Sequence, residues 1–108
     1  MNPKKLEMNI AKGYSRKFCN AIGMGMSKES SLRLAIEENS SPIFNSSLWL
    51  ELAMSGEKNI NDIDKNKIIS NVSREVIDNC GYPLGLEGDE GIKEFETMLT
   101  QELGKVNQ

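Results

Sequence analysis

The sequence contains no histidine. Histidine is the commonest general base in enzymes, the commonest ligand of transition metals and the usual switch near neutral pH. Its absence excludes serine–histidine and cysteine–histidine nucleophilic catalysis for this chain acting alone. No other nucleophile motif takes its place. We therefore expect a protein that is not an enzyme and that needs no metal or other cofactor.

Long hydrophobic runs are also missing. No run approaches the roughly 20 apolar residues that a helix needs to cross a bilayer. The first residues, MNPKKLEMNIAKG, lack the uncharged apolar stretch of a secretory signal. These two features predict a cytoplasmic protein of bacterial type that does not interact with membranes.

Cysteine is scarce as well, with Cys19 and Cys80 lying 61 positions apart and outside any CxxC pattern. A disulfide between them is conceivable, but the spacing alone cannot establish one. A free cysteine usually behaves as a small hydrophobic residue. The sequence therefore favours two reduced, partly buried thiols.

The pattern that is present is helical. The chain has 108 residues, the size of one domain, and its 38% hydrophobic and 27% charged composition argues against disorder. Apolar residues recur three or four positions apart, as they do on one face of an amphipathic helix. We predict a single all-α domain, a small bundle or orthogonal array of four to five helices. The expected helices cover residues 3–22, 27–39, 42–55, 62–80 and 90–103.

Glycine and serine mark the expected helix ends. Gly23 follows the first helix, and Ser27 is a suitable N-cap for the second. Gly81 suits the left-handed position after the fourth helix, and Gly104 suits the end of the last. Residues 81–91 contain four glycines and a proline, so we expect a loop there.

Charge is divided unevenly along the chain. Residues 1–33 carry seven Lys or Arg and two Glu, whereas the remaining residues carry six basic and fourteen acidic side chains. The basic residues of the first helix lie near Tyr14 and Phe18, a combination that could contact phosphates and stack on bases. Nucleic-acid binding or regulation is therefore the alternative function, through Lys5, Lys12, Arg16 and Lys17.

The densest acidic cluster begins at Glu87 and extends into the last expected helix. Three apolar residues just before it are expected to be exposed, and they could anchor a partner that the carboxylates attract. The main hypothesis is a non-enzymatic interaction protein whose acidic C-terminal half docks another protein with a basic surface. The predicted contact residues are Tyr82, Leu84, Leu86, Glu87, Asp89, Glu90 and Glu94.

Several classes of protein have this physical profile: immunity proteins, antitoxins, adaptors and assembly chaperones. A homodimer also stays open, because the amphipathic first helix and the lone Trp49 could form a symmetric face. The sequence does not choose among these classes.

Overall fold

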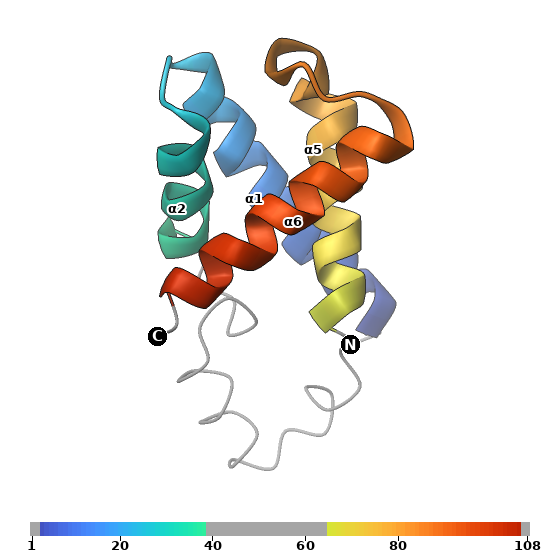
Figure 1. Cartoon of the computed structure of the whole chain (residues 1–108). Helices are drawn as coiled ribbons and strands as arrows, with labels where there is room; N and C mark the ends of the chain where they lie inside the picture. Colours follow the sequence, from blue (N-terminus) through green and yellow to red (C-terminus); the bar gives the residue numbers. More distant parts are fainter. Residues whose placement is uncertain (1–2, 39–64, 107–108) are drawn as a thin grey trace.

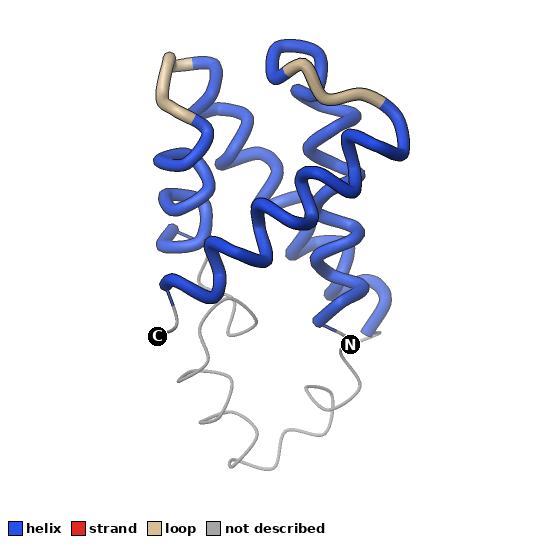
Figure 2. The backbone as a smooth tube through the Cα atoms, viewed as in Figure 1, coloured by secondary structure: helices blue, strands red, loops and turns tan. Residues whose placement is uncertain are grey.

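The computed structural model describes residues 3–38 and 65–106, which form four helices (Figure 1). They are α1 (Pro3–Gly23), α2 (Lys28–Glu38), α5 (Lys65–Leu84) and α6 (Gly88–Val106). Within these two stretches there is no strand, and Figure 2 shows one short turn between α1 and α2 and another between α5 and α6. The prediction of an all-α bundle is confirmed. The helix expected over residues 42–55, with Trp49, lies outside the described residues.

The four helices form two hairpins, α1–α2 and α5–α6. Helix α1 packs against α5 and α2, and α6 packs against the same two helices. In Figure 1, α6 runs diagonally across the front of the bundle, and the turns of both hairpins lie at the same end of the molecule. The turn between α5 and α6 therefore projects from one end of the bundle.

The core consists of the apolar faces that the helical spacing predicts. Phe18 lies at its centre, with its ring 6.4 Å from that of Tyr14 and 5.1 Å, edge to face, from that of Phe95. Aliphatic side chains from all four helices surround these rings. Burial of this cluster is the main stabilising contribution to the fold.

The turn between α1 and α2 confirms the predicted serine cap. The Ser30 amide donates to the Ser27 hydroxyl oxygen at 3.1 Å, so Ser27 satisfies one of the free amides at the start of α2. Helix α1 ends at Gly23, one residue later than expected, and the residue with positive φ is Gly25, at 90°. Its amide donates to the Ile22 carbonyl at 3.0 Å and closes the helix end.

The predicted end of the fourth helix is wrong. Cys80 has non-helical angles (φ −145°, ψ 23°), which bend α5, and one further turn continues to Leu84. Because the bend starts a new turn, Pro83 lies among the first residues of that turn, whose amides need no intrahelical partner. The left-handed residue is Gly85, with φ 72°, and Gly81 has no positive φ.

The loop expected over residues 81–91 is correspondingly shorter. Only residues 85–87 are non-helical, because the extra turn of α5 precedes them and α6 begins at Gly88. At the other end of α6, the prediction that Gly104 ends the helix is also wrong. Gly104 has no positive φ, and the helix continues to Val106.

Candidate functional site

The main candidate site is the α5–α6 turn with the first two turns of α6, here called the acidic tip (residues 82–94). Two backbone hydrogen bonds shape it: the Gly85 amide donates to the Tyr82 carbonyl at 3.1 Å, and the Leu86 amide to the Gly81 carbonyl at 3.0 Å. This pair closes the end of α5 in the Schellman arrangement. The turn that carries the acidic residues is therefore held by regular backbone hydrogen bonds.

Leu86 holds the turn against the bundle. The Leu86 side chain is only 5% exposed and belongs to the core cluster. Its backbone fits against two glycines: a Cβ added at Gly81 would lie 2.5 Å from the Leu86 carbonyl oxygen, and one at Gly91 would lie 2.8 Å from the Leu86 carbonyl carbon. The close approach needs both glycines.

This packing corrects part of the predicted apolar anchor. The expectation that Leu86 is exposed is wrong, because the Gly81 and Gly91 contacts draw it into the core. Leu84 is half-buried and packs against the same cluster. Of the three apolar residues predicted to face a partner, only Tyr82 is largely free, with 86% of the residue exposed.

The predicted carboxylates of the acidic tip are all exposed: Glu87, Asp89, Glu90 and Glu94. No ion pair joins any of these four to another residue of the described stretches. Three of them line one depression of about 340 Å³, together with the backbone around Gly85: Glu87, Glu90 and Glu94. Lys93 is the one basic residue of the segment, against these four carboxylates, so the segment is strongly negative.

Part of this negative charge also serves the helix. Asp89 and Glu90 lie in the first turn of α6, where carboxylates interact favourably with the positive end of the helix dipole. The helix dipole therefore explains why Asp89 and Glu90 stand at these positions, and no binding partner is needed to explain them. Glu87 precedes the helix and Glu94 lies beyond its first turn, so the dipole does not explain the whole cluster.

The basic residues of the alternative site lie on α1. Lys5, Lys12, Arg16 and Lys17 are all exposed, but the Lys17 ammonium is 3.1 Å from a carboxylate oxygen of Glu38 on α2. The neighbouring aromatic residues, Tyr14 and Phe18, are fully buried. Base stacking on these two rings, which the nucleic-acid alternative used, is therefore excluded by their burial.

A buried carboxylate that sequence reasoning missed connects α6 to α2. Glu102 is 2% exposed, and its carboxylate accepts a hydrogen bond from the Arg33 side chain at 3.0 Å. The Lys105 ammonium lies 3.8 Å from the same carboxylate and 3.5 Å from that of Glu29. These cations therefore neutralise acidic residues at the α2–α6 contact and not at the acidic tip.

The prediction of two reduced thiols is wrong. Cys19 and Cys80 form a disulfide, with their Cα atoms 5.8 Å apart. Since α1 packs along α5, two cysteines far apart in sequence face each other at the bend of α5. Spacing along the chain could not reveal this contact, because it depends on how the two helices cross.

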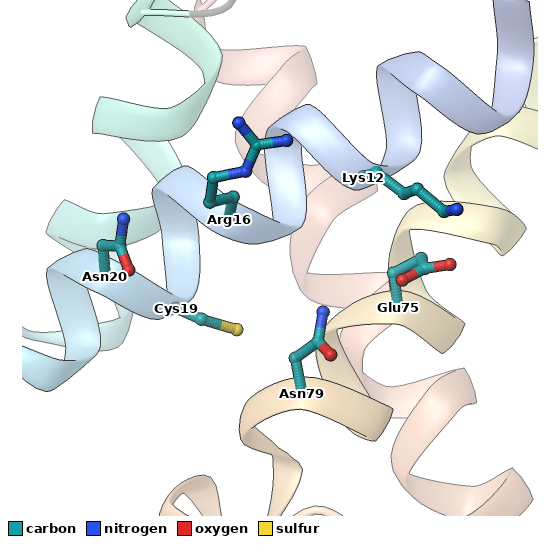
Figure 3. Close-up of a pocket in the computed structure, with 6 residues that line it drawn as sticks. All are labelled: Lys12, Arg16, Cys19, Asn20, Glu75 and Asn79. Carbon is teal, nitrogen blue, oxygen red and sulfur yellow. The ribbon is translucent and has the colours of Figure 1, made fainter.

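A second depression, of about 350 Å³, opens beside this disulfide between α1 and α5 (Figure 3). Its lining includes Cys19 but not Cys80, and Figure 3 shows the Cys19 sulfur directed from α1 toward the α5 side. Lys12 and Arg16 belong to the basic residues predicted from the sequence, whereas the two polar α5 residues opposite them were not predicted. The lining residues are Lys12, Arg16, Cys19, Asn20, Glu75 and Asn79.

Three further observations bear on function. Among the described residues, no group of three or more cysteine or carboxylate side chains is placed to hold a metal ion. None of the described helices combines the length and apolar character needed to cross a membrane. The chain matches no protein family, no curated protein and no solved structure.

Proposed function

We propose that this protein is a non-enzymatic interaction protein that docks a basic partner protein through the acidic tip. One observation carries the proposal: the carboxylates of Glu87, Asp89, Glu90 and Glu94 are exposed and make no ion pair with the rest of the described chain. The described ion pairs of Lys17, Arg33 and Lys105 lie at the contacts of α2 with α1 and with the C-terminal part of α6. The negative charge of the tip is therefore available to a partner.

The shape of the tip supports this use. Tyr82, 86% exposed at the end of α5, supplies an aromatic surface of the kind that dominates the affinity of protein interfaces. The depression lined by Glu87, Glu90 and Glu94 fits a lysine or arginine side chain of the partner. Carboxylates at such a rim mainly accelerate association, whereas the aromatic anchor slows dissociation.

The proposal extends to class and compartment. An immunity protein, antitoxin, adaptor or assembly chaperone would each use an acidic tip to cover a basic surface. A cytoplasmic, bacterial setting stays a prediction. The Cys19–Cys80 disulfide opposes the cytoplasmic part of it, since disulfides persist mainly in oxidising compartments.

Charge reversal tests the docking proposal. The tip variant carries Glu87→Lys, Asp89→Lys and Glu90→Lys, and a matched control carries Glu29→Lys, Glu37→Lys and Glu38→Lys on α2. Both change the net charge equally, and the control breaks only exposed ion pairs of small energy. We expect association with immobilised poly-L-lysine at low salt to slow about tenfold more in the tip variant than in the control.

The same experiment separates the alternative. Equal slowing in the two variants would show that net charge, and not the tip, drives association, and would overturn the proposal. Binding of a short DNA duplex that weakens on Lys12→Gln and Arg16→Gln, and steeply with salt, would favour the nucleic-acid function instead.

A further inference from the structure

The two cysteines of the disulfide differ in exposure. Cys80 is 6% exposed and belongs to the apolar core cluster, whereas Cys19 is partly exposed and lines the depression between α1 and α5 (Figure 3). A thiolate that approaches from solvent therefore meets Cys19 and not Cys80. Thiol–disulfide exchange proceeds by attack of a thiolate on one sulfur, so access decides which sulfur is attacked.

Two polar side chains, the buried Ser15 and the exposed Asn79, lie next to Cys19. The Ser15 hydroxyl oxygen is 3.9 Å from the Cys19 sulfur, and Ser15 is fully buried. The Asn79 side-chain amide donates to that hydroxyl oxygen at 3.0 Å. Since a disulfide sulfur carries no hydrogen, the Ser15 hydroxyl is the donor in its contact with Cys19. This donor would stabilise a thiolate at Cys19, and no equivalent donor to Cys80 is found among the described residues.

The rim of the depression carries a small excess of positive charge. Arg16 and Lys12, one and two turns before Cys19 on α1, line it together with a single carboxylate, Glu75 on α5. In Figure 3 the Arg16 guanidinium extends away from the sulfur, and the Lys12 ammonium lies toward Glu75. These cations are placed at the entrance, where they would attract a carboxylate-bearing thiol.

The geometry points to a thiol-exchange site: the Cys19–Cys80 disulfide is opened and reformed through Cys19 by small thiols that carry carboxylates, of which glutathione is the chemical type. Cys19 is the exchanging cysteine, and Cys80 is the buried cysteine that resolves the mixed disulfide. The inference does not depend on the proposed docking function.

The chemistry is balanced by the thiol alone. The thiolate attacks the Cys19 sulfur, the Cys19–Cys80 bond breaks, and its electron pair leaves on the Cys80 sulfur, which takes a proton from water. A second thiolate attacks the outer sulfur of the mixed disulfide, releases the oxidised thiol and leaves a thiolate at Cys19. In reverse, the Cys19 thiolate attacks an external disulfide, and Cys80 displaces the outer thiol.

The first test uses the unaltered disulfide protein. It is exposed briefly to millimolar reduced glutathione, quenched with acid, alkylated and mapped by peptide mass spectrometry. We expect molecules with glutathione on Cys19 and the alkyl group on Cys80, at least tenfold more abundant than the opposite pattern. Glutathione mainly on Cys80, equal amounts on both cysteines, or no opening of the bond would each overturn the proposal.

Matched variants provide the second test. Cys80→Ala and Cys19→Ala lose the same covalent link, and each is reacted with oxidised glutathione. We expect the adduct to form at least tenfold faster on Cys19, in Cys80→Ala, than on Cys80, in Cys19→Ala. If the two variants, folded or unfolded, react at equal rates and the unaltered protein shows no preference for Cys19, the proposed exchange site is wrong.

The charge requirement is tested with Arg16→Gln. Opening of the disulfide by glutathione should slow several-fold in this variant, while opening by the uncharged 2-mercaptoethanol should not change. Equal slowing with both thiols would overturn the assignment of a carboxylate-bearing substrate.

Discussion

The Tyr14 hydroxyl on α1 donates a hydrogen bond of 3.0 Å to the backbone carbonyl of Leu32 on α2. The tyrosine is fully buried, so this bond links the two helices of the first hairpin through the core. Burial, with the Glu102 carboxylate as a second cause, raises the pKa of Tyr14 above its usual range. The phenol is thus held in its neutral, donating form.

Removing this hydroxyl should weaken the hairpin. Tyr14→Phe loses one buried hydrogen bond between α1 and α2, and we expect the free energy of unfolding to fall by about 1–2 kcal/mol in urea denaturation. Tyr82→Phe is the control, because Tyr82 is largely exposed. A Tyr14→Phe protein as stable as the control would show that the bond contributes nothing to the fold.

The raised pKa of Tyr14 also predicts how stability depends on pH. In the unfolded chain a tyrosine has a pKa of about 10. Above that pH the unfolded chain releases the proton while the folded protein keeps it, so stability falls as the pH rises. The loss should be steeper in the wild type than in Tyr14→Phe, by up to about 1.4 kcal/mol per pH unit. Parallel stability profiles above pH 10 would contradict it.

Reduction of the disulfide should destabilise the protein without abolishing its core. The bond links residues 61 positions apart, and chain entropy predicts a loss of about 4 kcal/mol when it opens. Denaturation with and without dithiothreitol measures the loss. A Cys19→Ala/Cys80→Ala double variant, which has no bond to reduce, should be insensitive to the reductant. A wild type that is equally insensitive would disprove the stabilising role.

The two glycines Gly81 and Gly13 should respond in opposite directions to alanine. At Gly81 the new Cβ would lie 2.5 Å from the Leu86 carbonyl oxygen, so the turn must shift, and we expect a loss of about 1–3 kcal/mol. At Gly13, inside α1, no atom beyond the surrounding helix backbone lies within 4 Å of the new Cβ, so alanine should stabilise by up to about 1 kcal/mol. Thermal unfolding monitored by circular dichroism tests both. If Gly81→Ala melts as high as Gly13→Ala, Leu86 is not held as described.

Two ion pairs of similar length should differ in energy. Arg33→Met leaves the buried Glu102 carboxylate with only the more distant Lys105, and should cost about 1–3 kcal/mol. Lys17→Met breaks the pair with Glu38, in which both side chains are about half exposed, and should cost about 0–1 kcal/mol. Urea denaturation of the two variants gives the comparison. A larger loss for Lys17→Met would mean that burial of Glu102 does not set the energy of its pair.

Local pattern by itself determined most of the helical architecture. Phe18 and its neighbours at helical spacing defined the buried face of α1, and Ser27 marked the start of α2, because amphipathic spacing and capping depend on residues within a few positions of each other. The same reasoning found the exposed carboxylates of the acidic tip, since charged side chains rarely lose contact with water.

Only the tertiary structure decided the contacts between distant parts of the chain. The disulfide of Cys19 with Cys80, the burial of Leu86 and the pairing of Arg33 with Glu102 all depend on how helices cross. A one-dimensional period records which face of a helix is apolar, but not which residue of another helix it meets. For that reason the sequence predicted an exposed Leu86 and two free thiols. Packing of the turn on α6 buried the leucine, and packing of α5 on α1 brought the two cysteines together in a disulfide.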